Sequence, residues 1–163
     1  MFISAKDLDN EIQILTIRGP KNYLTISPIF QPFFKLEILR ITDSNIPSLG
    51  KNSFWGIRSL RILDLSRNNI SILVDDNFRG QDDLNELDLC KNKIYKLGSG
   101  VFRHMKELRS LNLADNLIED LGDRIFSTIG KLQYLDLSGN PLDDLNPDVF
   151  KDIQVNSNKS NVK

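Results

Sequence analysis

The chain repeats itself every 24 residues, and this period limits its fold more than any other feature of the sequence. A Leu-x-x-Leu-x-Leu pattern, or a close variant of it, begins at Ile12, Leu36, Leu60, Leu84, Leu108 and Leu132. We number the 24 positions of each unit as slots, counted from these six residues. Periods of about 20 to 50 residues are typical of stacked repeating units that bury a common core. The sequence therefore predicts a solenoid.

Each unit contains a short segment in which aliphatic residues alternate with residues of varied type. Slots four and six are aliphatic in every unit, as Leu63 and Leu65 show. Alternation with a period of two residues is typical of a strand that has one buried face. We therefore expect one short strand per unit, with slots four and six pointing into the core.

Two further slots indicate how the units stack. Slot nine holds the asparagines Asn68, Asn92, Asn116 and Asn140, and slot nineteen holds the phenylalanines Phe30, Phe54, Phe78, Phe102, Phe126 and Phe150. Stacked amides can satisfy backbone groups where the chain bends away from the strand. In the first two units Pro20 and Ser44 replace the slot-nine asparagine, and Asn45 could substitute for Ser44 after a small shift. We expect a ladder of asparagines and a spine of phenylalanines.

The repeated stretches LRILDLSRNNI (60–70) and LQYLDLSGNPL (132–142) resemble the 24-residue "typical" leucine-rich repeat of animal cell-surface adhesion molecules and Toll-like receptors. The resemblance implies an α/β right-handed solenoid, curved, with a parallel sheet on its concave face and irregular or short helical segments on its convex side. It implies a repeat domain over 1–155 and a disordered polar tail over 156–163. Family ectodomains usually carry cysteine-rich caps, so we interpret the chain as a fragment, an isoform or a truncated gene model.

Composition excludes several classes of function. The formal net charge of −1 does not favour nucleic acid or anionic lipid as a partner. Apolar runs fall short of the ~20 residues that cross a bilayer. Residues 1–7 lack the basic flank and the apolar core that are typical of a signal peptide. Cys90 is the only cysteine, so neither an intrachain disulfide nor a cysteine-based metal cage can form. We expect no cofactor and no metal.

The candidate binding residues follow from the alternation in the strands. If slots four and six point inward, slots three and five point out from the concave sheet. The candidates are Ile14, Ile38, Arg40, Ile62, Asp64, Glu86, Asp88, Tyr134 and Asp136. Exposed isoleucines can mark a contact surface, or they can reflect the preference of β-branched residues for strands. Asp64 and Asp88 could hold Ca²⁺, but without an evident third ligand we interpret them as a solvated stripe.

These observations predict a protein-binding module, because the sequence shows no nucleophile with a base, no metal cluster and no phosphate-binding loop. By resemblance we expect an extracellular or cell-surface receptor or adhesion protein whose ligand binds the concave sheet. The alternative is a cytoplasmic adaptor or substrate-recruiting scaffold. Asn69 begins an Asn-Ile-Ser sequon and is a possible glycosylation site. Cys90 is expected to be an outward-facing, unreactive thiol.

Overall fold

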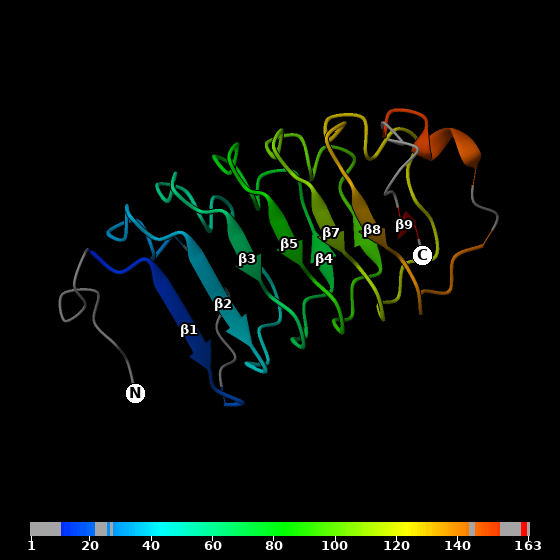
Figure 1. The fold of residues 1–163 in the computed structure, drawn as a ribbon. Helices are drawn as coiled ribbons and strands as arrows, with labels where there is room; N and C mark the ends of the chain where they lie inside the picture. The colour runs from blue at the N-terminus through cyan, green and yellow to red at the C-terminus, as the bar shows by residue number, and fades with distance from the viewer. Residues whose placement is uncertain (1–10, 22–25, 27, 144–145, 154–160, 163) are drawn as a thin grey trace.

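The computed structural model describes residues 11–21, 26, 28–143, 146–153 and 161–162. In this part of the chain the repeats stack as successive coils, each of which contributes one strand to a parallel sheet (Figure 1). The strands are β1 (Ile14–Arg18), β2 (Ile38–Thr42), β3 (Ile62–Asp64), β5 (Glu86–Asp88), β7 (Ser110–Asn112), β8 (Tyr134–Asp136) and β9 (Asn161–Val162). Their order in the sheet is β1-β2-β3-β5-β7-β8-β9. The described part of the chain is therefore a solenoid with a parallel sheet along one side, as the sequence predicts.

The register of the sheet follows the sequence period. Ile14 pairs with Ile38, and Ile38 pairs with Ile62, so residues in the same slot of successive units lie side by side. The same register continues from β3 through β8. Because neighbouring strands lie about 4.8 Å apart, a property repeated in one slot becomes a continuous row on the surface.

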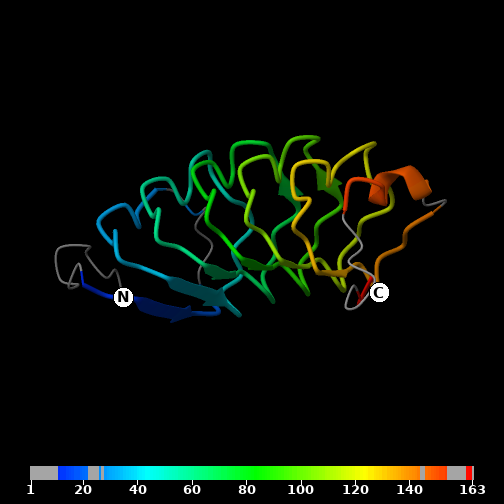
Figure 2. The same cartoon turned by 45° about the horizontal axis from the view of Figure 1, so that its top comes forward.

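The side opposite the sheet is built mainly from turns (Figure 2). It includes a short two-stranded parallel sheet, β4 (Ile72–Leu73) with β6 (Lys96–Leu97). It also includes a 3-10 helix, η1 (Pro147–Phe150), whose first turn is capped by Asn146, the side chain of which accepts a hydrogen bond from the Asp148 backbone N–H. This irregular convex side agrees with the expectation from the sequence.

The core lies between the two sides and is filled from both. Leu39 and Leu63 in slot four are fully buried, and so are the slot-nineteen rings of Phe54, Phe78, Phe102 and Phe126. The Phe54 and Phe78 rings stack with their centroids 5.9 Å apart, and Phe126 stacks on Phe102 at 6.0 Å and on Phe150 at 6.1 Å. Each ring is thus covered by the coils next to it, which is why one coil could not form this core alone.

The slot-nine asparagines join neighbouring coils by hydrogen bonds. The Asn116 amide nitrogen donates to the carbonyl oxygens of Leu113 in its own coil and Leu89 in the preceding coil, both at 3.0 Å. Its side-chain oxygen accepts from the Ile94 backbone N–H at 3.0 Å. Asn68, Asn92 and Asn140 repeat this arrangement. The amide therefore satisfies backbone groups where a strand ends and no sheet partner remains.

In every unit but the first, the residue before slot nine adopts a left-handed backbone. Slot eight is occupied by Asp43, Arg67, Lys91, Asp115 and Gly139, with φ between 49° and 72°. A left-handed residue turns the chain sharply out of the strand, and for a residue with a Cβ this conformation costs about 1–2 kcal/mol. The side-chain hydrogen bonds of the following asparagine help to hold this turn.

The second unit fills slot nine with a serine. The Ser44 hydroxyl accepts from the Gly19 N–H at 3.1 Å and donates to the Thr42 carbonyl oxygen at 2.8 Å. Asn45 does not take over the slot, because its side chain is directed to the carbonyl oxygen of Pro20 in the first coil. Ser44 thus preserves part of the bridging role with a shorter side chain.

The polar segment 156–163 is described only at Asn161–Val162, which form β9 beside β8. The rest of the segment, and with it the expectation that the segment is disordered, lies outside the described residues.

Candidate functional site

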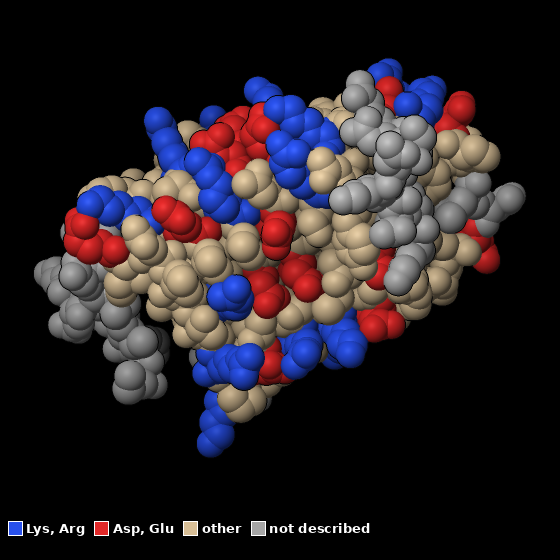
Figure 3. All heavy atoms as spheres, viewed as in Figure 1, with Lys and Arg blue, Asp and Glu red and all other residues tan. Residues whose placement is uncertain are grey.

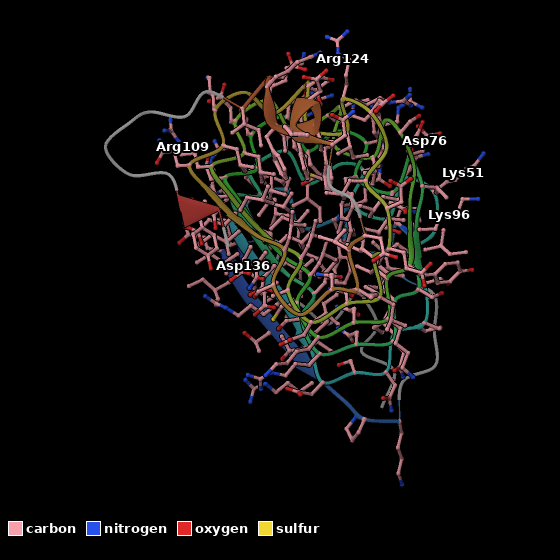
Figure 4. The ribbon with its side chains drawn as sticks, turned by 90° about the vertical axis from the view of Figure 1, so that its right-hand side faces the viewer. Lys51, Asp76, Lys96, Arg109, Arg124 and Asp136 are labelled. Carbon is pink, nitrogen blue, oxygen red and sulfur yellow. The ribbon has the colours of Figure 1, made fainter. Side chains whose placement is uncertain are left out.

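The outward side of the seven-stranded sheet, which we call the sheet face, carries the residues of slots three and five. Ile14 is 59% exposed, and Ile38 and Ile62 are half-buried. Leu39 and Leu63, the next residues on β2 and β3, are fully buried. Viewed along the solenoid, Asp136 lies on the sheet side and Lys96 on the opposite side (Figure 4). All nine residues proposed as binding candidates lie on this face, in the slots that the alternation assigns to them.

The first half of the sheet face carries an apolar strip. Ile14, Ile38 and Ile62 are direct neighbours in the register of β1, β2 and β3. Beside them, Thr16, Arg40 and Asp64 form the parallel row of slot five. The guanidinium of Arg40 therefore stands at the border between the apolar strip and the acidic residues that follow.

The second half of the sheet face is acidic. Acidic side chains gather over β3 and β5, with basic side chains along the lower edge of the sheet (Figure 3). A shallow hollow here is lined by the side chains of Arg40, Asp64, Glu86, Asp88, Asn112 and Tyr134, among others. Carboxylates that face an open hollow beside one guanidinium attract a partner group of positive charge.

The slot-five carboxylates also have a structural role that the sequence analysis missed. The Asp64 Oδ1 accepts a hydrogen bond from the Ser66 N–H at 2.9 Å, and the Asp88 Oδ1 accepts one from the Cys90 N–H at 2.8 Å. Asn112, in the same slot, accepts from the Ala114 N–H at 3.1 Å. Asp and Asn side chains commonly bond to the backbone two residues ahead and thereby form turns. The repeated choice of Asp or Asn at this slot was the feature of the sequence that could have predicted these turns.

Tyr134 and Asp136 form a hydrogen-bonded pair at the end of the hollow. The Tyr134 hydroxyl donates to the Asp136 Oδ2 at 2.9 Å. This hydrogen bond, together with burial and the negative charges of Asp136 and Asp88, raises the pKa of Tyr134 above its ordinary value of 10.0. The phenol is therefore protonated and held in place at neutral pH.

Cys90 lies next to the acidic residues and is half-buried. Burial, and then the hydrogen bond and charge of Asp88, raise the pKa of the Cys90 thiol to about 12. Because the thiolate is the nucleophilic form of cysteine, this environment opposes reactivity. Among the described residues, no group of three or more His, Cys, Asp and Glu side chains is arranged to hold a metal ion.

Asn69 lies outside the sheet face, one residue beyond the ladder. Its side chain is half-buried, and its amide nitrogen donates to the Asn45 Oδ1 at 3.3 Å. The Asn69 and Ser71 side chains of the sequon are therefore partly accessible, whereas Ile70 between them is buried in the core.

Comparison with protein families identifies the repeat. The profile of the family described as Leucine rich repeat matches residues 34–85, 82–142 and 106–154, so the chain belongs to the leucine-rich-repeat family. Repeats of this family generally act as protein-interaction modules rather than as enzymes. A search of curated proteins finds no match. In the parts that the structure describes, no helix is long and apolar enough to cross a membrane.

Proposed function

We propose that this chain is a non-enzymatic module of an extracellular receptor or adhesion protein, and that it binds a protein ligand through the sheet face. The observation that carries the proposal is the row of Ile14, Ile38 and Ile62 on neighbouring strands. Their side chains point away from the core, which slots four and six already fill. Aligned apolar groups at a surface are a feature of protein contact sites.

The sheet face has the size and the chemistry that such a contact needs. The six strands from β1 to β8 lie about 4.8 Å apart and so span about 24 Å, a length comparable with the edge of a standard interface of about 800 Å² on each partner. Arg40 and Tyr134, residue types that are enriched among binding hot spots, stand on either side of the acidic hollow. A ligand that places apolar groups on the isoleucines and a cationic group over Asp64 and Asp88 matches both halves of the sheet face.

The extracellular setting is supported by the 24-residue repeat type and by the sequon at Asn69. The alternative, a cytoplasmic adaptor, is favoured by the single free cysteine, Cys90, which suits a reducing compartment. Surface biotinylation of intact cells that naturally express the gene distinguishes an extracellular receptor from a cytoplasmic adaptor. Labelling of the protein before lysis supports the receptor, and labelling only after lysis supports the adaptor.

Binding through the sheet face is tested by screening the purified chain against arrayed recombinant ectodomains and arrayed cytosolic domains. The complex with any partner is then mapped by hydrogen exchange. We expect protection of the backbone in β1, β2 and β3. Protection confined to β4 and β6, on the opposite side, would overturn the proposed face.

A further inference from the structure

A second hollow lies away from the sheet face, in the turns that lead back toward the strands. It has a volume of about 540 Å³ and is lined by Gln31, Trp55, Gly56, Arg58, Gly80, Asp82 and Asp83. These residues occupy slots twenty to twenty-four of three successive coils. Its volume lies within the 300–1,000 Å³ that is typical of small-ligand pockets.

Two glycines create the space. Slot twenty-one holds Gly56 and Gly80 in neighbouring coils, whereas the other units carry Pro32, His104, Thr128 and Asp152 there. Both glycines have a left-handed backbone, with φ of 98° and 86°. A Cβ at Gly80 would lie 3.1 Å from a carbon of the Trp55 ring, and one at Gly56 would lie 2.8 Å from the side chain of Gln31. The absence of side chains at this slot therefore leaves the hollow open beside the indole.

Trp55 supplies an aromatic wall that the core does not require. It is the only tryptophan of the chain, and its side chain is 42% exposed although the neighbouring Phe54 is fully buried. The Arg79 guanidinium lies over the ring, 5.2 Å from its centroid, and helps to fix its orientation. The equivalent residues in the other coils are polar, namely Gln31, Arg79, Arg103, Ser127 and Lys151.

The other side chains that line the hollow are polar, with charges of both signs. Arg58, Asp82 and Asp83 line it, and each carboxylate already has a cationic partner. Asp83 lies 3.2 Å from the Arg61 guanidinium, and Asp82 lies 3.8 Å from the Lys106 ammonium. A strongly charged ligand would therefore meet both attraction and repulsion. Planar carboxylate, amide and guanidinium groups that line the same hollow as an aromatic ring suit a neutral ligand with many hydroxyl groups.

We propose that this hollow is a binding site for a neutral saccharide. One face of the sugar ring, which carries C–H groups, packs against the Trp55 indole. The hydroxyl groups donate hydrogen bonds to the carboxylates of Asp82 and Asp83 and accept them from Arg58 and Gln31. The site is separate from the sheet face, so protein binding there and saccharide binding here do not compete for the same residues.

The sole tryptophan makes the site directly observable. Titration with chitotriose, maltotriose and cellotriose up to millimolar concentrations should give, for at least one of them, a saturable change in tryptophan emission. Calorimetry on Trp55→Ala and Asp83→Asn should then show affinity for that sugar reduced roughly tenfold or more. Tyr95→Ala is the matched control, because Tyr95 is an aromatic residue with 55% exposure outside the hollow.

Three results overturn the proposal. The first is an unchanged emission with all three sugars, and the second is binding that Trp55→Ala leaves intact. The third is an equal loss of binding in Tyr95→Ala and Trp55→Ala. Circular dichroism melts of each variant establish that the solenoid is folded before affinities are compared.

Discussion

The side-chain amide of Asn92 donates a hydrogen bond to the carbonyl oxygen of Leu65, 27 residues earlier in the chain and one coil away, at 3.0 Å. The same nitrogen donates to the Leu89 carbonyl oxygen, and the Asn92 Oδ1 accepts from the Ile70 N–H. Asn92→Ala removes all of these bonds and leaves buried backbone groups without partners. We expect the free energy of unfolding to fall by roughly 1–3 kcal/mol.

Asn69→Ala is the control for this prediction. Asn69 follows the ladder residue Asn68 directly, but its side chain donates a part-buried hydrogen bond to the Asn45 side chain and does not take the place of a ladder amide. Chemical denaturation of both variants should show a much smaller loss for Asn69→Ala. Equal losses would mean that the slot-nine amides do not hold the coils together.

The phenylalanine spine should dominate the packing energy of the convex side. Phe102 is fully buried and stacks on Phe126. Phe102→Ala should therefore lower the free energy of unfolding by about 3–5 kcal/mol, since it removes a large ring and leaves a cavity. Leu117→Ala provides the comparison, because Leu117 is 50% exposed and should lose little. A mild effect of Phe102→Ala in urea unfolding would contradict the stacked core.

The protonation of Cys90 links stability to alkaline pH. The thiol has an ordinary pKa of 9.0, and in the fold its pKa is raised to about 12. The folded state therefore favours the protonated thiol. This contribution to stability is fully present below pH 9 and is lost as the pH rises toward 12. Between these values the native chain should lose more stability than Cys90→Ala, as measured by denaturation at a series of pH values.

Alkylation gives an independent measure of the same thiol. Iodoacetamide should modify Cys90 slowly in the folded chain at pH 9 and rapidly after unfolding in urea. Equal rates in the folded and unfolded chain would show that the thiol is not protected by its surroundings.

Two substitutions at Asp88 separate its turn-forming role from its charge. Asp88→Asn keeps an oxygen that can accept from the Cys90 N–H, as Asn112 does for Ala114, so the melting temperature should change little. Removal of the negative charge should lower the pKa of Cys90 and speed its alkylation. Asp88→Ala loses the acceptor as well and should cost about 0.5–1.5 kcal/mol. Identical melting temperatures for Asp88→Asn and Asp88→Ala would show that the Asp88 side chain does not stabilise the turn.

The sequence predicts the sheet and its two faces because one period of 24 residues controls both. Once slots four and six are assigned to the core, the outward position of Ile38 and Asp64 follows without any knowledge of tertiary contacts. The ladder is equally predictable, since a polar residue repeated at one slot of a buried array requires repeated backbone partners.

Other features depend on relationships that a single unit does not display. The turn formed by Asp64 and the Ser66 N–H requires the backbone geometry at the end of the strand. The pairing of β4 with β6 involves only two residues per strand, too few for a recognisable alternation. The hollow beside Trp55 combines side chains from three coils, although the two glycines at slot twenty-one are visible once the repeats are aligned.

Binding of a protein through the sheet face requires that the isoleucines of the strip point outward from the strands. Ile38 and Leu39 are adjacent on β2, but Ile38 is half-buried on the sheet face and Leu39 is fully buried in the core. An arginine at Ile38 can extend into solvent, whereas an arginine at Leu39 would place a charge in the apolar core. Thermal melts should therefore separate the two variants, with Ile38→Arg close to the native chain and Leu39→Arg unfolded.

The decisive measurement is the affinity of Ile38→Arg for a partner identified in the array screen, compared with the native chain and with Tyr95→Ala. An interface centred on the isoleucine strip should lose affinity by roughly a hundredfold, the effect expected when a hot spot is replaced by a charge. Tyr95→Ala, on the opposite side, should bind like the native chain. Native affinity of a folded Ile38→Arg, or loss of binding in Tyr95→Ala alone, would contradict the claim.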